Sequence, residues 1–225
     1  MSFMEAAKCQ VNGSDYIGAF ATTTDRYTFV PFGMPAKLIA MIHDVLKTEC
    51  VSIGINGTDL IGLFSRANSN GILMSNIASA EDVALIKGLS LGINVGILES
   101  SINAIGNAVL ANDRIAIVDV EYDDGEAKQI GDVLGVEVVK NEIGGFKTVG
   151  ATNILTNGGC VINNRGSDSD KRMLDKMTGF DSVRTTANTG SLIIGLASLA
   201  NSKGLLVGSN TTGFEMERML QALGD

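Results

Sequence analysis

Three cysteines and one histidine are the residues of this 225-residue chain that are best suited to nucleophilic or metal chemistry. The cysteines, Cys9, Cys50 and Cys160, lie far apart and have no CxxC spacing, which is typical of reduced thiols in an intracellular protein. The histidine, His43, stands within a helical pattern, with no second His or Cys at metal-ligand spacing. The sequence therefore predicts no metal site and no cofactor.

Phosphate-binding and hydrolase motifs are absent from the sequence. It has neither a GxxxxGK[ST] loop nor a GxSxG elbow. The formal net charge of -8 argues against a broad nucleic-acid-binding face, because such faces depend on Lys and Arg to release counterions. Apolar runs such as LIIGLASLA are too short to span a membrane, and MSFMEAAKCQ does not resemble a signal peptide. We therefore expect a cytoplasmic protein that contacts no membrane and has a basic protein partner.

One eleven-residue segment occurs twice in the chain, with few changes. IGLFSRANSNG at 61–71 and IGLASLANSKG at 194–204 are identical at eight of eleven positions. Their leading Ile-Gly pair also stands at 17 and 105, and Val149-Gly150 fills the remaining place, so that the steps are 44, 44, 44 and 45 residues. Self-similarity at a fixed period is the signature of a repeat architecture. The sequence predicts five pseudo-symmetric units of about 44 residues, beginning near 17, 61, 105, 149 and 194, in a single domain over 1–225.

Within each unit the pattern predicts a strand, a turn, a strand, a helix and a strand. The runs ILM after NSNG and LLV after NSKG are typical of hairpins. The acidic run around Glu121, Asp123 and Asp124 is interpreted as a solvated loop before a helix, and Pro35 is expected in the first helical turn of unit one. Capping-box spacing is found at Ser79 with Asp82, Ser167 with Asp170, and Thr212 with Glu215.

The fifth unit lacks a strand after its helix, which we expect over about residues 213–223. AAKCQV at 6–11 precedes the first Ile-Gly pair just as CVSIGI precedes the second, but no helix comes before it. We hypothesise that this N-terminal strand completes the fifth unit and closes the ring, which satisfies the open sheet edges. Five ββαβ units closed in a circle describe an α/β fold of the pentein-type α/β propeller class.

Three stretches carry a more specific resemblance: INAIGNAVLANDRIAIV at 102–118, IGDVLGVEVVK at 130–140 and LANSKGLLVGSNTTGFEMERMLQALG at 199–224. They resemble the archaeal and eukaryotic translation initiation factor six family, in register from about residue 17 to residue 224. The resemblance implies a non-catalytic anti-association factor that binds the large (50S) ribosomal subunit at its inter-subunit face and sterically blocks the small (30S) subunit. It also implies release by an elongation-factor-like GTPase. For a closed ring we expect a monomer.

By family position, the candidate ribosome-binding residues lie beside the Ile-Gly pairs and in the strands after them. Each candidate also has a purely structural explanation. Steric crowding alone would explain the repeated glycines, and turn formation would explain the asparagines at 68, 112, 157 and 201. Arg66 could simply be solvated. The candidates are Gly18, Leu63, Arg66, Asn68, Gly106, Asn107 and Thr152.

The chain departs from the family pattern in two places. Many members have a proline after the second strand of the middle units, where this chain has Ser75, Val120 and Asn164, so we expect less restrained loops. Some members have basic residues beside the second Ile-Gly pair, where this chain has Leu63. We therefore expect limited contact with rRNA and more contact with a basic ribosomal protein at the inter-subunit face.

Two other functions remain as alternatives. Pentein relatives that modify guanidino groups use a Cys nucleophile near the chain end, with a His and carboxylates around the central cavity. Here no Cys follows Cys160, and the only His lies in a helix pattern, which argues against that chemistry. The remaining alternative is a propeller scaffold that serves some other complex.

Overall fold

Fifteen strands form five three-stranded sheets in the computed structural model, which describes residues 4–224. In every sheet the first strand pairs antiparallel with the second, which pairs parallel with the third. In that order the sheets contain β2 (Thr22–Thr23), β3 (Tyr27–Pro31) and β4 (Glu49–Ile53); β5 (Ser65–Ala67), β6 (Gly71–Ser75) and β7 (Asn94–Leu98); β8 (Val109–Ala111), β9 (Ile115–Val118) and β10 (Glu137–Lys140); β11 (Ile154–Leu155), β12 (Cys160–Asn163) and β13 (Val183–Thr185); and β14 (Ser198–Ala200), β15 (Gly204–Gly208) and β1 (Glu5–Cys9).

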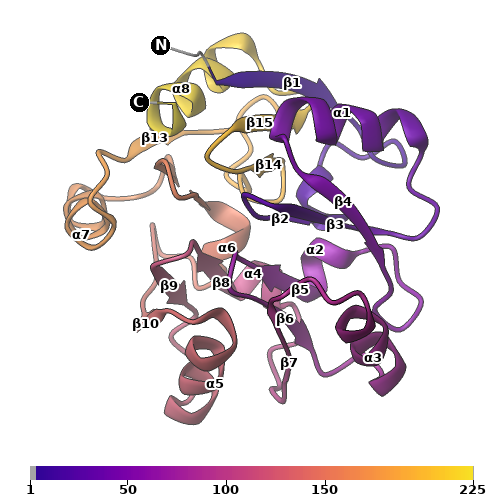
Figure 1. Cartoon of the computed structure of the whole chain (residues 1–225). Helices are drawn as coiled ribbons and strands as arrows, with labels where there is room; N and C mark the ends of the chain where they lie inside the picture. Colours follow the sequence, from indigo (N-terminus) through magenta and orange to yellow (C-terminus); the bar gives the residue numbers. More distant parts are fainter. Residues whose placement is uncertain (1–3, 225) are drawn as a thin grey trace.

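One long helix of each unit lies at the periphery, around the central strands (Figure 1). Four of the helices bury side chains four residues apart, such as Ile42 and Leu46 or Ile130 and Leu134, because residues at this spacing share a helix face, whereas the helix over residues 80–88 buries Ile86 alone. The prediction of five ββαβ units in an α/β propeller is confirmed. The helices are α1 (Ala36–Leu46), α3 (Ala80–Gly88), α5 (Asp124–Leu134), α7 (Asp168–Thr178) and α8 (Gly213–Leu223).

The predicted helix starts are also confirmed. Ser79, Ser167 and Thr212 each accept the backbone N–H of an acid three residues later, and that acid accepts the cap's own N–H in return. A fourth capping box joins Asp123 to Glu126, and the acidic run is the exposed loop that leads into α5, as we expected. Pro35 is the N-cap of α1 and lies one residue before the helix.

Closure of the ring by the N-terminal strand is confirmed. β1 pairs parallel with β15, from Glu5 opposite Gly204 to Cys9 opposite Gly208. The strand covers 5–9 instead of the expected 6–11, because Val11 already belongs to a turn, where it forms a bridge with Ser14. The two ends of the chain therefore meet in one sheet, and Figure 1 shows them side by side.

The hydrophobic core is divided into five clusters, each at a boundary between neighbouring units. At the first boundary, Phe29 and Val51 of unit one pack with Ile61 and Ile72 of unit two. Every unit contributes to two clusters, so the apolar burial that drives folding depends on neighbours. None of the helices within residues 4–224 has the length and apolar character that would be needed to cross a membrane.

Short helices begin at the Ile-Gly pairs, where we expected strands. They are η1 (Ile17–Ala19), α2 (Ile61–Phe64), α4 (Ile105–Ala108) and α6 (Val149–Thr152), and residues 194–197 form a turn in the fifth unit. The first strand of each hairpin starts only after this turn. Each Ile-Gly pair is thus held by helical backbone at one end of the ring.

Polar side chains restrain the turns that follow the second strands. Ser75, Asp119 and Asn163 each accept a backbone N–H two residues later, at 3.5, 2.9 and 3.0 Å. Pro31 holds the equivalent place in unit one, where the turn is also closed by a backbone bond from Met34 N to Pro31 O. Val120 and Asn164 lie one residue beyond these restrained positions, and Ser75 lies at one of them.

Candidate functional site

The two ends of the ring differ, and we name them by their residues. The glycine end carries Gly18, Gly62, Gly106, Gly150 and Gly195. The turn end carries the hairpin turns, whose equivalent residues are Asp25, Ser69, Asp113, Asn157 and Ser202. In each unit the second strand runs from the turn end to the glycine end, and the third strand runs parallel to it. The loop that joins the second strand to the peripheral helix therefore lies at the glycine end.

The five glycines form a closed circle of backbone contacts. A Cβ on Gly62 would overlap the carbonyl oxygen of Gly18, and one on Gly18 would lie 2.7 Å from that of Gly195. The same relation joins Gly106 to Gly62, Gly150 to Gly106, and Gly195 to Gly150. Since real Cβ atoms do not approach oxygen this closely, only glycine fits at these positions. The expectation that crowding explains these glycines is confirmed.

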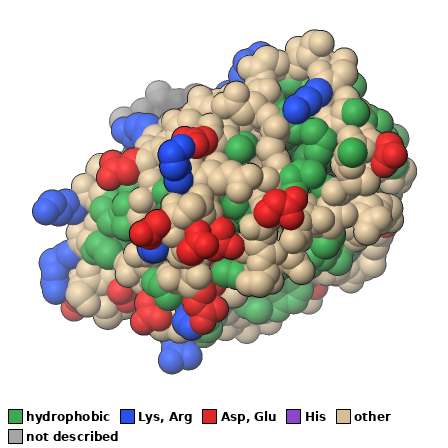
Figure 2. All heavy atoms as spheres, turned by 90° about the horizontal axis from the view of Figure 1, so that it is seen from below, with side chains coloured by type: hydrophobic (Ala, Val, Ile, Leu, Met, Phe, Trp, Pro, Cys, Tyr) green, Lys and Arg blue, Asp and Glu red, His purple; other side chains and the backbone are tan. Residues whose placement is uncertain are grey.

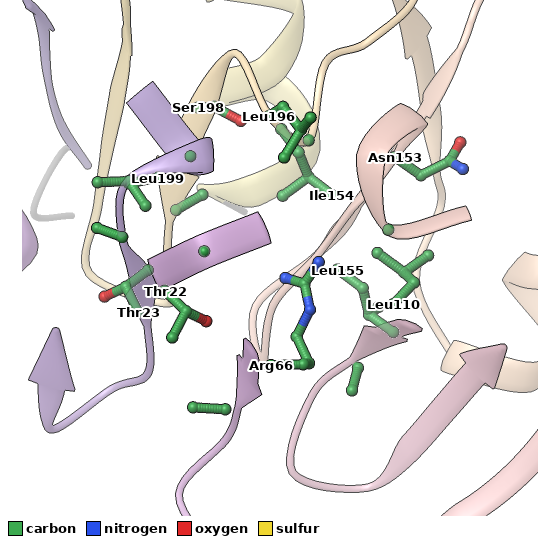
Figure 3. A pocket seen from close by; sticks show the side chains of 18 residues that line it. Thr22, Thr23, Arg66, Leu110, Asn153, Ile154, Leu155, Leu196, Ser198 and Leu199 are labelled. Carbon is green, nitrogen blue, oxygen red and sulfur yellow. The ribbon is translucent and has the colours of Figure 1, made fainter. Parts of the chain in front are cut away.

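A cavity of about 50 Å³ lies on the axis, between the glycine circle and the hairpin strands. Arg66, on β5, extends its guanidinium into this cavity (Figure 3). Its Nη2 donates to the Gly106 carbonyl at 2.6 Å, while its Nε is buried with no hydrogen-bond partner. Arg66 is therefore directed inward, where we had weighed a solvated or RNA-contacting side chain.

Burial lowers the pKa of Arg66 to about 10, because the enclosing protein replaces water around the charged form. The guanidinium is still protonated at neutral pH. Ala21, Thr22, Asn153 and Ser198 also line the cavity, and its lining contains no Asp, Glu, Cys or His within the described part of the chain. The cavity thus holds one uncompensated positive charge.

At the turn end, buried amides join neighbouring units. Asn68 is 3% exposed and donates from Nδ2 to the carbonyls of Asn112 and Leu134, at 3.0 and 2.8 Å. Asn112 donates in the same way to Thr156 O, and Asn201 to Thr24 O, both at 3.0 Å. Each Oδ1 also accepts two N–H groups of its own hairpin turn. The predicted turn role is confirmed, with an additional bond between units.

The equivalent of Asn68 in unit four is Thr156, not Asn157. Thr156 Oγ1 accepts the N–H groups of Gly158 and Gly159, as Thr24 Oγ1 does for its own turn in unit one. Asn157 instead donates from Nδ2 to a carboxylate oxygen of Asp25 and of Asp113, both at 2.7 Å. Asn157 thus stands one residue late in the repeat, and Thr156 fills the turn position because a hydroxyl makes the same turn bonds as an amide oxygen.

The other candidate residues lie at or near the glycine end. Leu63 and Asn107 directly follow ring glycines and are partly exposed, and Asn107 Oδ1 has no hydrogen-bond partner among the described residues. Thr152 is 2% exposed, and its hydroxyl donates to Thr148 O at 3.0 Å. The position equivalent to Leu63 and Asn107 is Ala151, one residue earlier. Gly18 and Gly106 are buried in the circle.

The glycine end also gathers apolar surface that sequence reasoning missed. Of the seven large hydrophobic side chains exposed within residues 4–224, five lie in loops or short turns at this end. They follow a second strand, precede a ring glycine, or open a peripheral helix, and no single-residue pattern marks them in the sequence. They are Tyr16, Phe32, Val120, Ile193 and Phe214, whose exposed fractions range from 38% to 72%.

The cysteines and the histidine are not placed for catalysis at the axis. Cys9 and Cys160 are buried, and Cys50 is partly buried. Burial raises the thiol pKa of Cys9 and of Cys50 to about 11 and that of Cys160 to about 12, which disfavours the nucleophilic thiolate. His43 lies on α1 with its side chain 71% exposed. In the part of the chain that the structure describes, no three His, Cys, Asp or Glu side chains are grouped to hold a metal.

Comparison with solved structures supports the fold assignment. A Cys-to-Ser mutant of DDAH from Pseudomonas aeruginosa, complexed with citrulline, matches with a TM-score of 0.52 over 98% of this chain and 89% of that one. The sequence identity is only 8%, so the likeness concerns the fold alone. The pentein-type α/β propeller predicted from the repeat is confirmed.

Comparison with known sequences is more specific. The chain is 34% identical over 225 residues to Translation initiation factor 6 of Pyrococcus abyssi, with 98% of this chain and 99% of that protein aligned. It is 36% identical over 208 residues to Translation initiation factor 6 of Methanosarcina acetivorans, covering 92% and 93%. The model of the eIF-6 family matches residues 6–222. Alignment from end to end, together with the five-unit ring, establishes that this chain belongs to the eIF-6 family.

Proposed function

We propose that this chain is a translation factor that binds the large (50S) ribosomal subunit at its inter-subunit face and sterically prevents the small (30S) subunit from joining. The relatives named above are translation initiation factors, and this supports a role on the ribosome. The mechanism needs no catalytic group, because an occupied surface is enough to block association. The protein would act in the cytoplasm as a monomer.

The exposed apolar surface of the glycine end is the observation that carries this proposal. Soluble monomers rarely gather large apolar side chains on one surface, and such patches mark interaction sites. Leu63 and Asn107 lie at this end and are partly exposed. We assign Leu63 and Asn107 to the docking surface. Gly18, Arg66, Gly106 and Thr152 then support that surface from within, and Asn68 supports the ring from the turn end.

The glycine end is suited to docking because its shape is fixed in advance. The glycine circle leaves no space for rearrangement, and four capping boxes hold the loops before the peripheral helices. A capping acid also binds the neighbouring turn, as when the Asn56 N–H donates to Asp82 Oδ2 at 2.8 Å. A preformed surface loses little conformational entropy on binding.

Charge restricts the type of partner. The net charge is -8, and Figure 2, which views the side of α3 and α5, shows acidic side chains over the middle and Lys and Arg mainly near the edges. A side of this kind would repel rRNA, so we propose that it faces away from the ribosome. The docking surface would meet a basic ribosomal protein and make limited rRNA contact. Release would involve an elongation-factor-like GTPase, as the family resemblance implies.

A sucrose gradient of mixed ribosomal subunits tests the proposal. Purified protein, added before the subunits join, should increase the free subunit peaks, reduce the joined peak and sediment with the large subunit. If the protein stays at the top of the gradient and leaves the joined peak unchanged, ribosome binding is refuted, and the alternative of a scaffold for another complex is favoured.

Matched variants test the assignment of the docking surface. Leu63→Glu places a charge at the glycine end, whereas Leu85→Glu makes the same change on α3, where Leu85 is 43% exposed. Leu63→Glu should reduce co-sedimentation by at least tenfold, since burying one uncompensated charge at an interface costs several kcal/mol. Leu85→Glu should bind as the unmodified protein does. Arg114→Glu probes the turn end, and selective loss of binding in that variant would show that the opposite end docks.

A further inference from the structure

The central cavity contains one positive charge, on Arg66, that no carboxylate among the described lining residues balances. Among the residues that the structure describes, Arg66 is the only charged one in the cavity lining. The equivalent positions of the other units hold Thr22, Leu110, Ile154 and Leu199, all of which are uncharged. Because four of the five equivalent positions are uncharged, the ring does not need a charge there in order to close. Packing alone therefore does not explain the arginine at position 66.

The hydrogen-bonding capacity of Arg66 is not met by the protein. A guanidinium carries five N–H donors, and here Nη2 has one carbonyl partner, the Gly106 oxygen at 2.6 Å. Nε is buried without a partner, and so is Thr22 Oγ1, which lines the same cavity. Arg66 also takes part in none of the ion pairs found within residues 4–224. Buried polar groups in native proteins nearly always have a partner.

The lowered pKa of Arg66, about 10, still leaves it charged at neutral pH. A buried charge without a counterion is strongly unfavourable in a low-dielectric interior. The carbonyl of Gly106 supplies only a partial negative charge. Arg66 is partly buried, with its Nε fully enclosed, and no carboxylate lines the cavity within residues 4–224, so a counter-charge would have to come from something that enters the cavity.

The size of the cavity limits what can enter. About 50 Å³ gives room for a few particles of the size of water, and excludes a nucleotide or a guanidino substrate. Figure 3 shows the guanidinium of Arg66 in the middle of the lining side chains, with Thr22 and Thr23 on one side and Leu110 and Leu155 on the other. A small spherical anion fits both the volume and the charge.

We propose that the central cavity binds a small inorganic anion of the halide class, chloride under ordinary conditions, held by the Arg66 guanidinium, with the Thr22 hydroxyl as a further donor. The anion neutralises the charge of Arg66 and joins units one and two at the axis. It stabilises the closed ring by binding the folded chain and not the unfolded one. The inference does not depend on ribosome binding.

Bromide tests the site directly in the unmodified protein. Crystals grown in sodium bromide should give an anomalous difference peak in the axial cavity, within hydrogen-bonding distance of Arg66 Nε. The same site should hold chloride density in crystals grown in sodium chloride. A cavity that shows only water in both crystals, with no bromide signal, overturns the proposal.

Thermal unfolding provides a test in solution. Tm is measured in sodium chloride and in sodium gluconate at equal ionic strength, since gluconate is too large for the cavity. The unmodified protein should have the higher Tm in chloride, and the difference should grow with concentration. Arg66→Leu, which introduces the residue found at positions 110 and 199, should abolish the difference. Arg218→Leu makes the same charge change at a partly exposed site on α8, away from the cavity, and should retain it.

The other outcomes of the Tm measurements also bear on the anion site. A Tm that is the same in both salts for the unmodified protein contradicts the proposal, and so does a chloride effect of equal size in Arg66→Leu and Arg218→Leu. If Arg66→Leu does not fold, Arg66→Lys keeps the charge but loses the Nε donor. That variant should show a reduced chloride effect, and an undiminished effect would argue against Arg66 as the ligand.

Discussion

Gly62 faces the backbone carbonyl oxygen of Gly18 so closely that a methyl group on Gly62 would overlap it. The two residues are 44 positions apart and belong to neighbouring units. Because the same contact recurs around the axis, each unit fixes the position of the next through backbone atoms alone. The ring is therefore sensitive to single atoms at its centre.

Gly62→Ala should destabilise the fold strongly. The added Cβ would overlap the carbonyl oxygens of Gly18 and Ala21, and neither backbone segment can move without disturbing the circle. We expect a loss of at least about 3 kcal/mol, the upper range for overpacking a core. Chemical denaturation measures the change. Gly88→Ala, at the end of α3 with open space around it, is the control and should be neutral or slightly stabilising. Equal effects of the two substitutions would contradict the crowding.

Asn68→Ala should weaken the contact between units two and three. It removes the donor to Asn112 O and Leu134 O and the acceptor of two turn N–H groups, all of them buried. We expect a loss of about 3 kcal/mol in the free energy of unfolding, since buried groups are left unpaired. Asn68→Thr should recover part of this loss, because Thr24 and Thr156 make the turn bonds at equivalent positions. Asn94→Ala, at an exposed amide, should cost less than about 1 kcal/mol.

Glu215 should make stability depend on acid pH. Burial alone raises its pKa, but hydrogen bonds from Thr186, Thr212 and Gly190 outweigh that effect and hold the pKa below its ordinary value of 4.5. The carboxylate therefore stabilises the fold above pH 4.5, and this contribution is lost as the pH falls through the lower folded-state pKa. Glu215→Gln should lower Tm at pH 7. Its Tm should also fall less steeply than that of the unmodified protein between about pH 5 and pH 3, the range in which the Glu215 contribution is lost. A parallel pH profile for both proteins would contradict this role.

Deleting residues 1–9 should open the ring. It removes β1 and leaves the edge of β15 unpaired, and it exposes part of the core around Leu206. We expect a large fall in Tm and a concentration-dependent tendency to associate through the free edge. Calorimetry and light scattering measure these two effects. Deletion of residues 1–3 is the control and should leave both unchanged.

Much of the architecture could be predicted because it is repeated. The Ile-Gly period, the capping boxes and the N-terminal strand all depend on short patterns that recur in register, so each occurrence supports the others. The helices at Ile61 and Ile105 could not be predicted in this way. They span four residues each, which is too short for a helical period to appear.

The site was less accessible to sequence reasoning, and Arg66 shows why. It lies in a strand of three residues, so local alternation says little about which way the side chain points. Its direction is set by Gly106 and Gly150, which belong to other units. Thr156 was missed for a different reason, because chemically different side chains can make the same turn bonds.

The pairing of β1 with β15 has a consequence for biosynthesis. Glu5 leaves the translating ribosome long before its partner Gly204. β1 must therefore stay without its native neighbour until β15 has emerged. Contacts so distant in sequence are formed late and slowly, because a long loop has to close first. We therefore expect ring closure to be a post-translational event, and the half-made chain to be the species most exposed to misfolding and proteolysis.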